Sequence, residues 1–111
     1  MSLIDKMINE VDCALRVCAG VATGSRTNPA SSQPDVELTH AESSLSARLL
    51  RVNHCGEVCA QALYRGQALV AKDAATRDFL LNAAEEEIDH LQWCRERVVA
   101  LGSKTSVLDP L

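Results

Sequence analysis

The sequence predicts an all-α fold in which an amphipathic N-terminal helix and a flexible linker precede a helical hairpin. The chain of 111 residues is 47% hydrophobic, yet it contains one Trp, one Tyr and one Phe. A core built from Leu, Val, Ala and Ile with few aromatic residues suits packed helices. Three segments also repeat apolar residues at helical spacing. The last two of these segments are joined by a very short link, which predicts that their helices are antiparallel.

Residues 2–20 are expected to form the amphipathic helix and residues 21–38 the flexible linker. The helix carries a stripe of apolar residues, namely Leu3, Ile4, Met7, Ile8, Val11, Leu15 and Cys18. We expect this stripe to pack against the core. A protein partner and a membrane surface stay open as alternatives, although the polar face lacks the Lys/Arg enrichment that favours a membrane. The linker is rich in Ser, Thr, Pro and Gly and shows no apolar period.

Residues 39–111 are expected to form the hairpin, whose first helix runs from Thr39 to about Ala71. Thr39 and Glu42 have the spacing of a capping box, which satisfies free N–H groups at a helix start. Apolar and small residues then follow at steps of four and three: Leu45, Leu49, Val52, Gly56, Cys59, Leu63, Gly66 and Val70. We expect this seam to be packed, because a glycine inside a helix costs about 1 kcal/mol and these two would let another backbone approach closely.

The second helix of the hairpin is expected to follow Asp73, a suitable N-cap, and to end at Leu101. Gly102 is a natural residue to follow a helix end. The seam of this helix consists of Leu80, Ala84, Glu87, Leu91, Cys94, Val98 and Leu101. The remaining residues, 103–111, are expected to form a turn.

Composition and charge argue against several functional classes. The net charge is -4 and no basic block is present, which argues against electrostatic binding of nucleic acid. No run approaches the roughly 20 apolar residues of a membrane span. The N-terminus lacks the basic start and unbroken apolar stretch of a secretory signal. The five cysteines show no framework spacing, so we expect free thiols in a reducing compartment.

The stretch AAEEEIDHLQWC, residues 83–94, contains three consecutive glutamates followed by a histidine. The helical register turns Glu85 away from the seam, leaves Glu86 as a weaker candidate and places Glu87 on the seam itself. A lone buried carboxylate is costly unless it is paired or bound to a metal. His90 lies three residues after Glu87, on the adjacent stripe of the same helix.

Glu57, Glu87 and His90 are therefore the candidate metal ligands. Helical bundles hold iron or manganese with a Glu-x-x-His from one helix and a Glu from its neighbour, and Glu57 lies one residue beside the seam of the first helix. A surface ion pair is the simpler interpretation of a Glu-x-x-His motif, and zinc held by cysteines is a further alternative. We expect three other residues to lie around the ligands: His54, Tyr64 and Glu86.

Two stretches, RVNHCGEVCAQALYRGQ and AAEEEIDHLQWCRERVVALGSKTSVLDPL, resemble the demethoxyubiquinone hydroxylase family of ubiquinone biosynthesis. Members of that family carry a His–small–Gly-Glu motif on one helix and Glu-x-Asp-His on the next. A Ser-x-Leu-x-Pro-Leu-like stretch follows. The amphipathic N-terminus and the Pro/Ser linker are also similar to bacterial members, so the resemblance covers nearly the whole chain.

The resemblance implies a ferritin-like four-helix bundle that acts as a di-iron monooxygenase. Such an enzyme uses O₂ to hydroxylate demethoxyubiquinol, with two iron ions in each complete site. By the same resemblance Glu57 would ligate one iron, Glu87 would bridge both and His90 would ligate one. It also implies a peripheral protein at the cytoplasmic face of the inner membrane, because the substrate is a lipid quinol.

The chain departs from the family in its ligand count. It offers two Glu and one His, where the full site has four Glu and two His. Cys55 also stands where alanine is usual, which is a minor difference. We expect the chain to be the N-terminal half of a longer product and inactive alone. A homodimer that rebuilds the site and a separate second-half polypeptide are alternatives, and a non-catalytic helical oligomerisation or metal-binding module is the alternative function.

Overall fold

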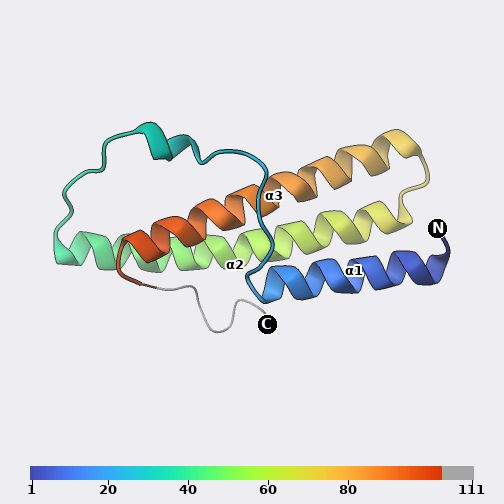
Figure 1. Ribbon diagram of the computed structural model, residues 1–111, viewed down its shortest axis with the longest axis horizontal. Helices are drawn as coiled ribbons and strands as arrows, with labels where there is room; N and C mark the ends of the chain where they lie inside the picture. The colour runs from blue at the N-terminus through green and yellow to red at the C-terminus, as the bar shows by residue number, and fades with distance from the viewer. Residues whose placement is uncertain (104–111) are drawn as a thin grey trace.

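The computed structural model describes residues 1–103, and these residues form helices joined by irregular segments (Figure 1). The elements are α1 (Leu3–Cys18), a short 3-10 helix η1 (Pro29–Ser32), α2 (His40–Val70) and α3 (Ala74–Ala100). Helices α2 and α3 pack together as an antiparallel hairpin, and α1 lies alongside α2. The predicted all-α hairpin is confirmed, and the turn predicted for the chain end lies, from residue 104 onward, outside the described residues.

Local hydrogen bonds determine where the hairpin helices begin and end. The Thr39 hydroxyl accepts from the Glu42 N–H, and the Glu42 carboxylate accepts from the Thr39 N–H, so the predicted capping box is present. The Asp73 carboxylate caps α3 by accepting from the Thr76 N–H at 2.8 Å. Gly102 has a φ of +79°, the left-handed conformation in which a helix commonly ends. All three signals were readable in the sequence.

The hairpin interface is built from small and polar residues of α2 and apolar residues of α3. The residues of α2 that are buried there recur every seven positions: Ala47, His54, Gln61 and Ala68. Those of α3 include three residues of the predicted seam, with Ala84 and Val98 fully buried and Leu91 3% exposed, and the other seam residues of α3 are partly exposed. The α3 seam is therefore confirmed as the face that packs against α2.

The predicted seam of α2 is exposed over the described chain, so our expectation that it is packed was wrong. Val52 and Val70 are 73% and 78% exposed, and Leu45, Leu49 and Leu63 are exposed as well. A Cβ placed on Gly56 or Gly66 would meet nothing within 4 Å. The reason is geometric: α3 packs on the face that carries Ala47 and Ala68, and the apolar seam points elsewhere on the same helix. We call this exposed set the α2 seam.

The expected packing of the apolar stripe of α1 against the core was also wrong. Leu3, Ile4, Met7, Ile8, Val11 and Leu15 are each more than half exposed. The polar side of α1 faces α2 instead, where Arg65 donates to both carboxylate oxygens of Glu10 at 2.8 and 3.0 Å. Gln61 also donates to the Cys13 sulfur at 3.4 Å. The helix is thus attached through polar contacts, and its apolar stripe is left uncovered.

The segment between α1 and α2 passes across the outer side of α3 (Figure 1). Arg95 donates to the Gly20 carbonyl oxygen at 2.8 Å, and Asn28 donates to Glu96 at 3.0 Å. Arg97 forms an ion pair with Asp35 at 3.1 Å. Apart from η1 this segment has no regular secondary structure, which is typical of a linker. Its flexibility stays a prediction. None of the helices in residues 1–103 combines the length and apolar character needed to cross a membrane.

Candidate metal centre

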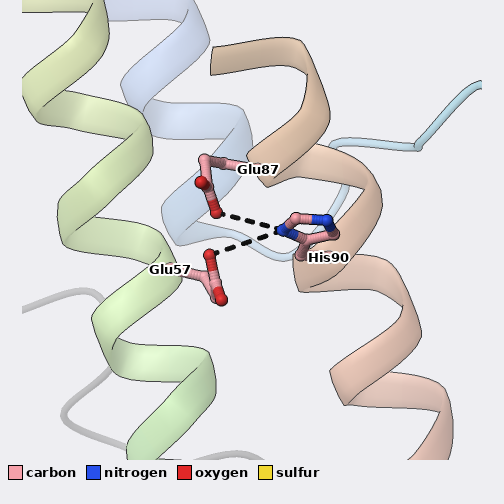
Figure 2. Close-up of side chains that lie close together, drawn as sticks. All are labelled: Glu57, Glu87 and His90. Atoms are coloured by element: carbon pink, nitrogen blue, oxygen red, sulfur yellow. Dashed lines mark hydrogen bonds and ion pairs between the residues drawn. The ribbon is translucent and has the colours of Figure 1, made fainter. Parts of the chain in front are cut away.

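Three side chains predicted as ligands converge between α2 and α3 (Figure 2). Glu57 comes from α2, and Glu87 and His90 come from a single turn of α3, three positions apart. The Nδ1 atom of His90 lies 3.3 Å from a carboxylate oxygen of Glu87 and 3.8 Å from one of Glu57. One potential ligand atom from each residue lies within 4.8 Å of those of the other two. Both carboxylates point toward the same nitrogen, as they would around a shared cation.

The cluster is partly buried, which strengthens its electrostatics. The side chains of Glu87 and Glu57 are 15% and 22% exposed, and that of His90 is 39% exposed. Two carboxylates brought together away from water repel each other unless a positive charge lies between them. The positive charge can be a protonated imidazole or a metal ion. The set of one nitrogen and four carboxylate oxygens suits iron, manganese or zinc.

The neighbouring predicted residues occupy different environments. Glu85 and Glu86 are exposed, as the helical register predicted for Glu85. His54 is buried on α2, and Tyr64 is partly exposed two turns after Glu57 on the same helix. Among the described residues, the cluster with metal-binding spacing consists of Glu57, Glu87 and His90, without His54 or a cysteine. The ligand roles themselves stay predictions.

Asp89 is a buried carboxylate that the sequence pattern did not reveal. Its side chain is 3% exposed and accepts from the backbone N–H groups of Ser25 at 2.7 Å and Arg26 at 3.3 Å. The guanidinium of Arg26 adds a hydrogen bond at 2.6 Å. Burial opposes ionisation of this carboxyl, but the hydrogen bonds from Arg26 and Ser25 hold its pKa below its ordinary value. Its partners lie more than 60 residues earlier in the chain, so no local periodicity could indicate them.

Trp93 lies between the imidazole of His90 and the guanidinium of Arg26. The centroids of the His90 and Trp93 rings are 5.5 Å apart and their planes are tilted by 50°. The guanidinium carbon of Arg26 lies 5.2 Å from the centroid of the same indole ring, a cation–π contact. The candidate ligand His90 is therefore flanked by carboxylates on one side and by an aromatic ring on another.

A family model and several curated relatives match this chain, and all of them point to the same family. The sequence model for the family described as ubiquinone biosynthesis protein COQ7 matches residues 44–111. A relative from Bordetella petrii is 51% identical over 109 residues, which cover 97% of this chain and 48% of the relative. A relative from Pseudomonas putida is 50% identical over 111 residues, covering 99% of this chain and 52% of the relative.

A third relative, from Chromobacterium violaceum, is 47% identical over 109 residues, which cover 98% of this chain and 53% of the relative. All three relatives carry the name 3-demethoxyubiquinol 3-hydroxylase. The chain thus spans about half the length of the curated relatives it matches. No solved structure matches it.

Proposed function

Because the chain belongs to the ubiquinone biosynthesis protein COQ7 family, we propose that it serves in the iron-dependent hydroxylation of demethoxyubiquinol. The observation that carries the proposal is the convergence of Glu57, Glu87 and His90 from two helices onto one point. The relatives' name, 3-demethoxyubiquinol 3-hydroxylase, supplies the reaction and the substrate. Since the chain spans about half of each relative, the activity is proposed for this chain together with the partner that completes its site.

The donor set fits iron. Two carboxylates and one imidazole match the oxygen and nitrogen ligands that di-iron helical bundles use. When bound, iron supplies the reaction with O₂ that places one oxygen atom in a ring C–H bond and releases the other as water, with two electrons drawn from a reductant. A lone set of three ligands leaves the other coordination positions to a partner, to water or to substrate.

The residues of the chain itself hold and shield the site. Glu57 and Glu87 provide negative charge to balance a divalent cation, and both are anchored on long, capped helices rather than on loops. The imidazole of His90 presents Nδ1 to the carboxylates. The apolar packing of Ala84 and Leu91 on either side of Glu87 keeps water from the hairpin side of the site.

A second copy of the chain is the partner that we propose to complete the site. A four-helix di-iron site uses a Glu from each of two helices and a Glu-x-x-His from each of two others. This chain contributes one of each, so a twofold axis would double the set. The uncovered α2 seam supports this arrangement, because exposed apolar residues along a helix favour a protein partner. The competing arrangements are a second half that follows in a longer product and a separate polypeptide that carries it.

We also propose a peripheral location at the cytoplasmic face of the inner membrane. The proposal is supported by the apolar stripe of α1, which faces away from the hairpin. It agrees with a lipid quinol as substrate, which the relatives' name implies for them. Localisation of a tagged chain in fractionated cells tests it, and recovery in the soluble fraction alone would contradict it.

Metal counting tests the proposed site directly. The chain is purified without oxygen in the presence of ferrous iron, and bound iron per chain is measured. We expect iron in the wild type, at least a tenfold weaker affinity in Glu87→Ala, which removes a ligand, and wild-type binding in Glu85→Ala. Glu85 is the matched control because it lies two residues away with a side chain that is 65% exposed. Equal iron in the wild type and Glu87→Ala would remove Glu87 from the ligand set.

A cellular test separates hydroxylation from mere metal binding. We expect the chain, with its partner, to restore ubiquinone in cells that lack the hydroxylase. An iron-loaded chain that fails to do so in every combination would favour a metal-binding module. A chain that associates without binding iron would favour the oligomerisation module, for which the exposed α2 seam is the supporting observation.

A further inference from the structure

A short piece of the linker is clamped onto α3 directly beside the candidate metal centre. The Gly24 N–H donates to the Gln92 side chain at 2.5 Å. Ser25 and Arg26 bring two N–H groups and one guanidinium to Asp89. Asp89 immediately precedes His90 and comes two residues after Glu87. We call residues 24–26 the clamp. The clamp is hydrogen-bonded to the turn of α3 that carries both Glu87 and His90.

The clamp depends on a close approach of two backbones. A Cβ on Gly24 would come within 2.9 Å of the Asp89 Cα atom and nearer still to its carboxylate, which real side chains do not do. Glycine at this position therefore has a packing reason. The close contact brings Arg26 over α3 at a fixed position, with its guanidinium anchored by the buried Asp89 carboxylate.

Arg26 connects the clamp to His90 through one aromatic ring. Its guanidinium stands over Trp93 with 5.2 Å to the ring centroid, and Trp93 in turn contacts the His90 imidazole. The indole N–H of Trp93 is buried and has no hydrogen-bond partner among the described residues. The orientation of this ring is thus set by packing and by the cation above it, not by a hydrogen bond.

We propose that Arg26 is a positioning residue for the metal centre, acting through Trp93 on His90. Fixed by Asp89, it holds the indole against the imidazole, and the imidazole then presents Nδ1 to Glu57 and Glu87. The role rests on the proposed metal site. Residues behind a ligand that fix its ring orientation typically change metal affinity by about 10–100-fold when they are removed.

Cobalt binding and tryptophan fluorescence test this proposal on the chain as it exists. Co²⁺ is titrated into the wild type, Arg26→Ala, Arg26→Lys and Arg95→Ala, and its visible absorption gives the affinity. Arg95→Ala is the matched control because Arg95 also ties the linker to α3, through the Gly20 carbonyl oxygen. The sequence contains one Trp, so emission without metal reports on Trp93 alone. Thermal unfolding followed by circular dichroism monitors the fold of each variant.

We expect Arg26→Ala to bind Co²⁺ about tenfold more weakly and to make Trp93 more accessible to a quencher in the metal-free protein. Arg26→Lys keeps the positive charge beside Asp89 but loses the planar group over the Trp93 ring. We therefore expect it to be as stable as the wild type, with a Co²⁺ affinity between those of the wild type and Arg26→Ala. Arg95→Ala should keep wild-type affinity and wild-type quenching.

Two results would overturn the positioning role while leaving the metal site intact. One is wild-type affinity in Arg26→Ala. The other is an equal loss in Arg95→Ala, which would mean that the linker acts only by holding the fold. If the wild type binds no Co²⁺ at all, the metal site fails and the positioning role fails with it.

Discussion

At the residue scale, three neighbouring carboxylates of α3 have three different environments. The side chain of Glu85 is 65% exposed, that of Glu87 is 15% exposed beside His90, and that of Asp89 is 3% exposed and paired with Arg26. Each difference follows from the 100° turn between successive helical residues, which points the three side chains in different directions. The buried Asp89–Arg26 pair has a structural role. The partly buried cluster of Glu87 with His90 is the one whose oxygen and nitrogen lone pairs could bind a cation.

The Asp89–Arg26 pair leads to a prediction about stability. Asp89→Asn replaces one acceptor oxygen by an N–H₂ group that faces donors from Ser25 and Arg26. Leaving such groups unsatisfied costs about 1–3 kcal/mol, so we expect the free energy of unfolding to fall by about that much. Urea denaturation followed by circular dichroism measures it.

The control for this substitution is Asp78→Asn, an exposed aspartate on the same helix. We expect its free energy of unfolding to remain within about 0.5 kcal/mol of the wild type. An Asp89→Asn protein as stable as this control would show that the clamp contributes little to the folded state.

At the scale of elements, the helix ends were predictable and the attachment of α1 was not. Capping depends on residues three positions apart, so Thr39 with Glu42 and Asp73 with Thr76 specify their helices locally. The side of α1 that meets the hairpin depends on Glu10 finding Arg65, which is 55 residues away. A helix with a marked apolar stripe usually buries that stripe, and here the stripe is exposed.

The exposed stripe of α1 leads to a prediction about membrane surfaces. Ile8→Glu should weaken binding to vesicles of phosphatidylethanolamine and phosphatidylglycerol by at least about tenfold, because burying one Ile side chain contributes roughly 1.5–3 kcal/mol. Vesicle flotation measures the bound fraction. Ile8 is 60% exposed, so the fold should be unaffected.

The matched control is Asn9→Glu, which adds the same charge at the next position, outside the apolar stripe. We expect this variant to float as the wild type does, apart from a small electrostatic loss on anionic vesicles. Equal binding by Ile8→Glu and the wild type would assign the stripe to a protein partner instead.

At the scale of the whole molecule, one bare hairpin leaves large apolar surfaces uncovered. Helices α2 and α3 bury small and polar residues of α2 against apolar residues of α3, while the Leu and Val residues of the α2 seam are exposed. Contiguous exposed apolar surface of this kind marks an interaction site. The three candidate ligands lie on the same hairpin, so in the proposed dimer association and completion of the site would occur together.

Association of two copies is therefore the prediction at this scale. Size-exclusion chromatography with light scattering should show a dimer that ferrous iron stabilises. Val52→Glu, on the α2 seam at a position that is 73% exposed, should shift it to a monomer and abolish iron binding at the same protein concentration. Arg48→Glu, on an exposed position outside the seam, is the control. A wild-type monomer at every concentration, with or without iron, would favour a second half that is supplied by a longer product or by a separate polypeptide.

The helices and the candidate ligands could be read directly from the sequence. Capping signals and apolar spacing placed the three helices within a residue or two of their bounds, because these interactions span a single helical turn. The register of α3 selected Glu87 over Glu85, and the spacing to His90 followed from it. Glu57 entered through the same helical logic on α2, and the structure brings all three together.

Which helix faces meet could not be read from the sequence. Both faces of α2 are compatible with a helix partner, and α3 packs on the face that carries the buried Ala47 and Ala68, not on the α2 seam. The Asp89–Arg26 clamp and the Glu10–Arg65 attachment join residues more than 50 positions apart, so no periodic pattern could signal them. Periodicity identifies a face that can be buried, but what covers that face depends on contacts between distant parts of the chain. For the α2 seam, we propose that the cover is a second copy of the chain.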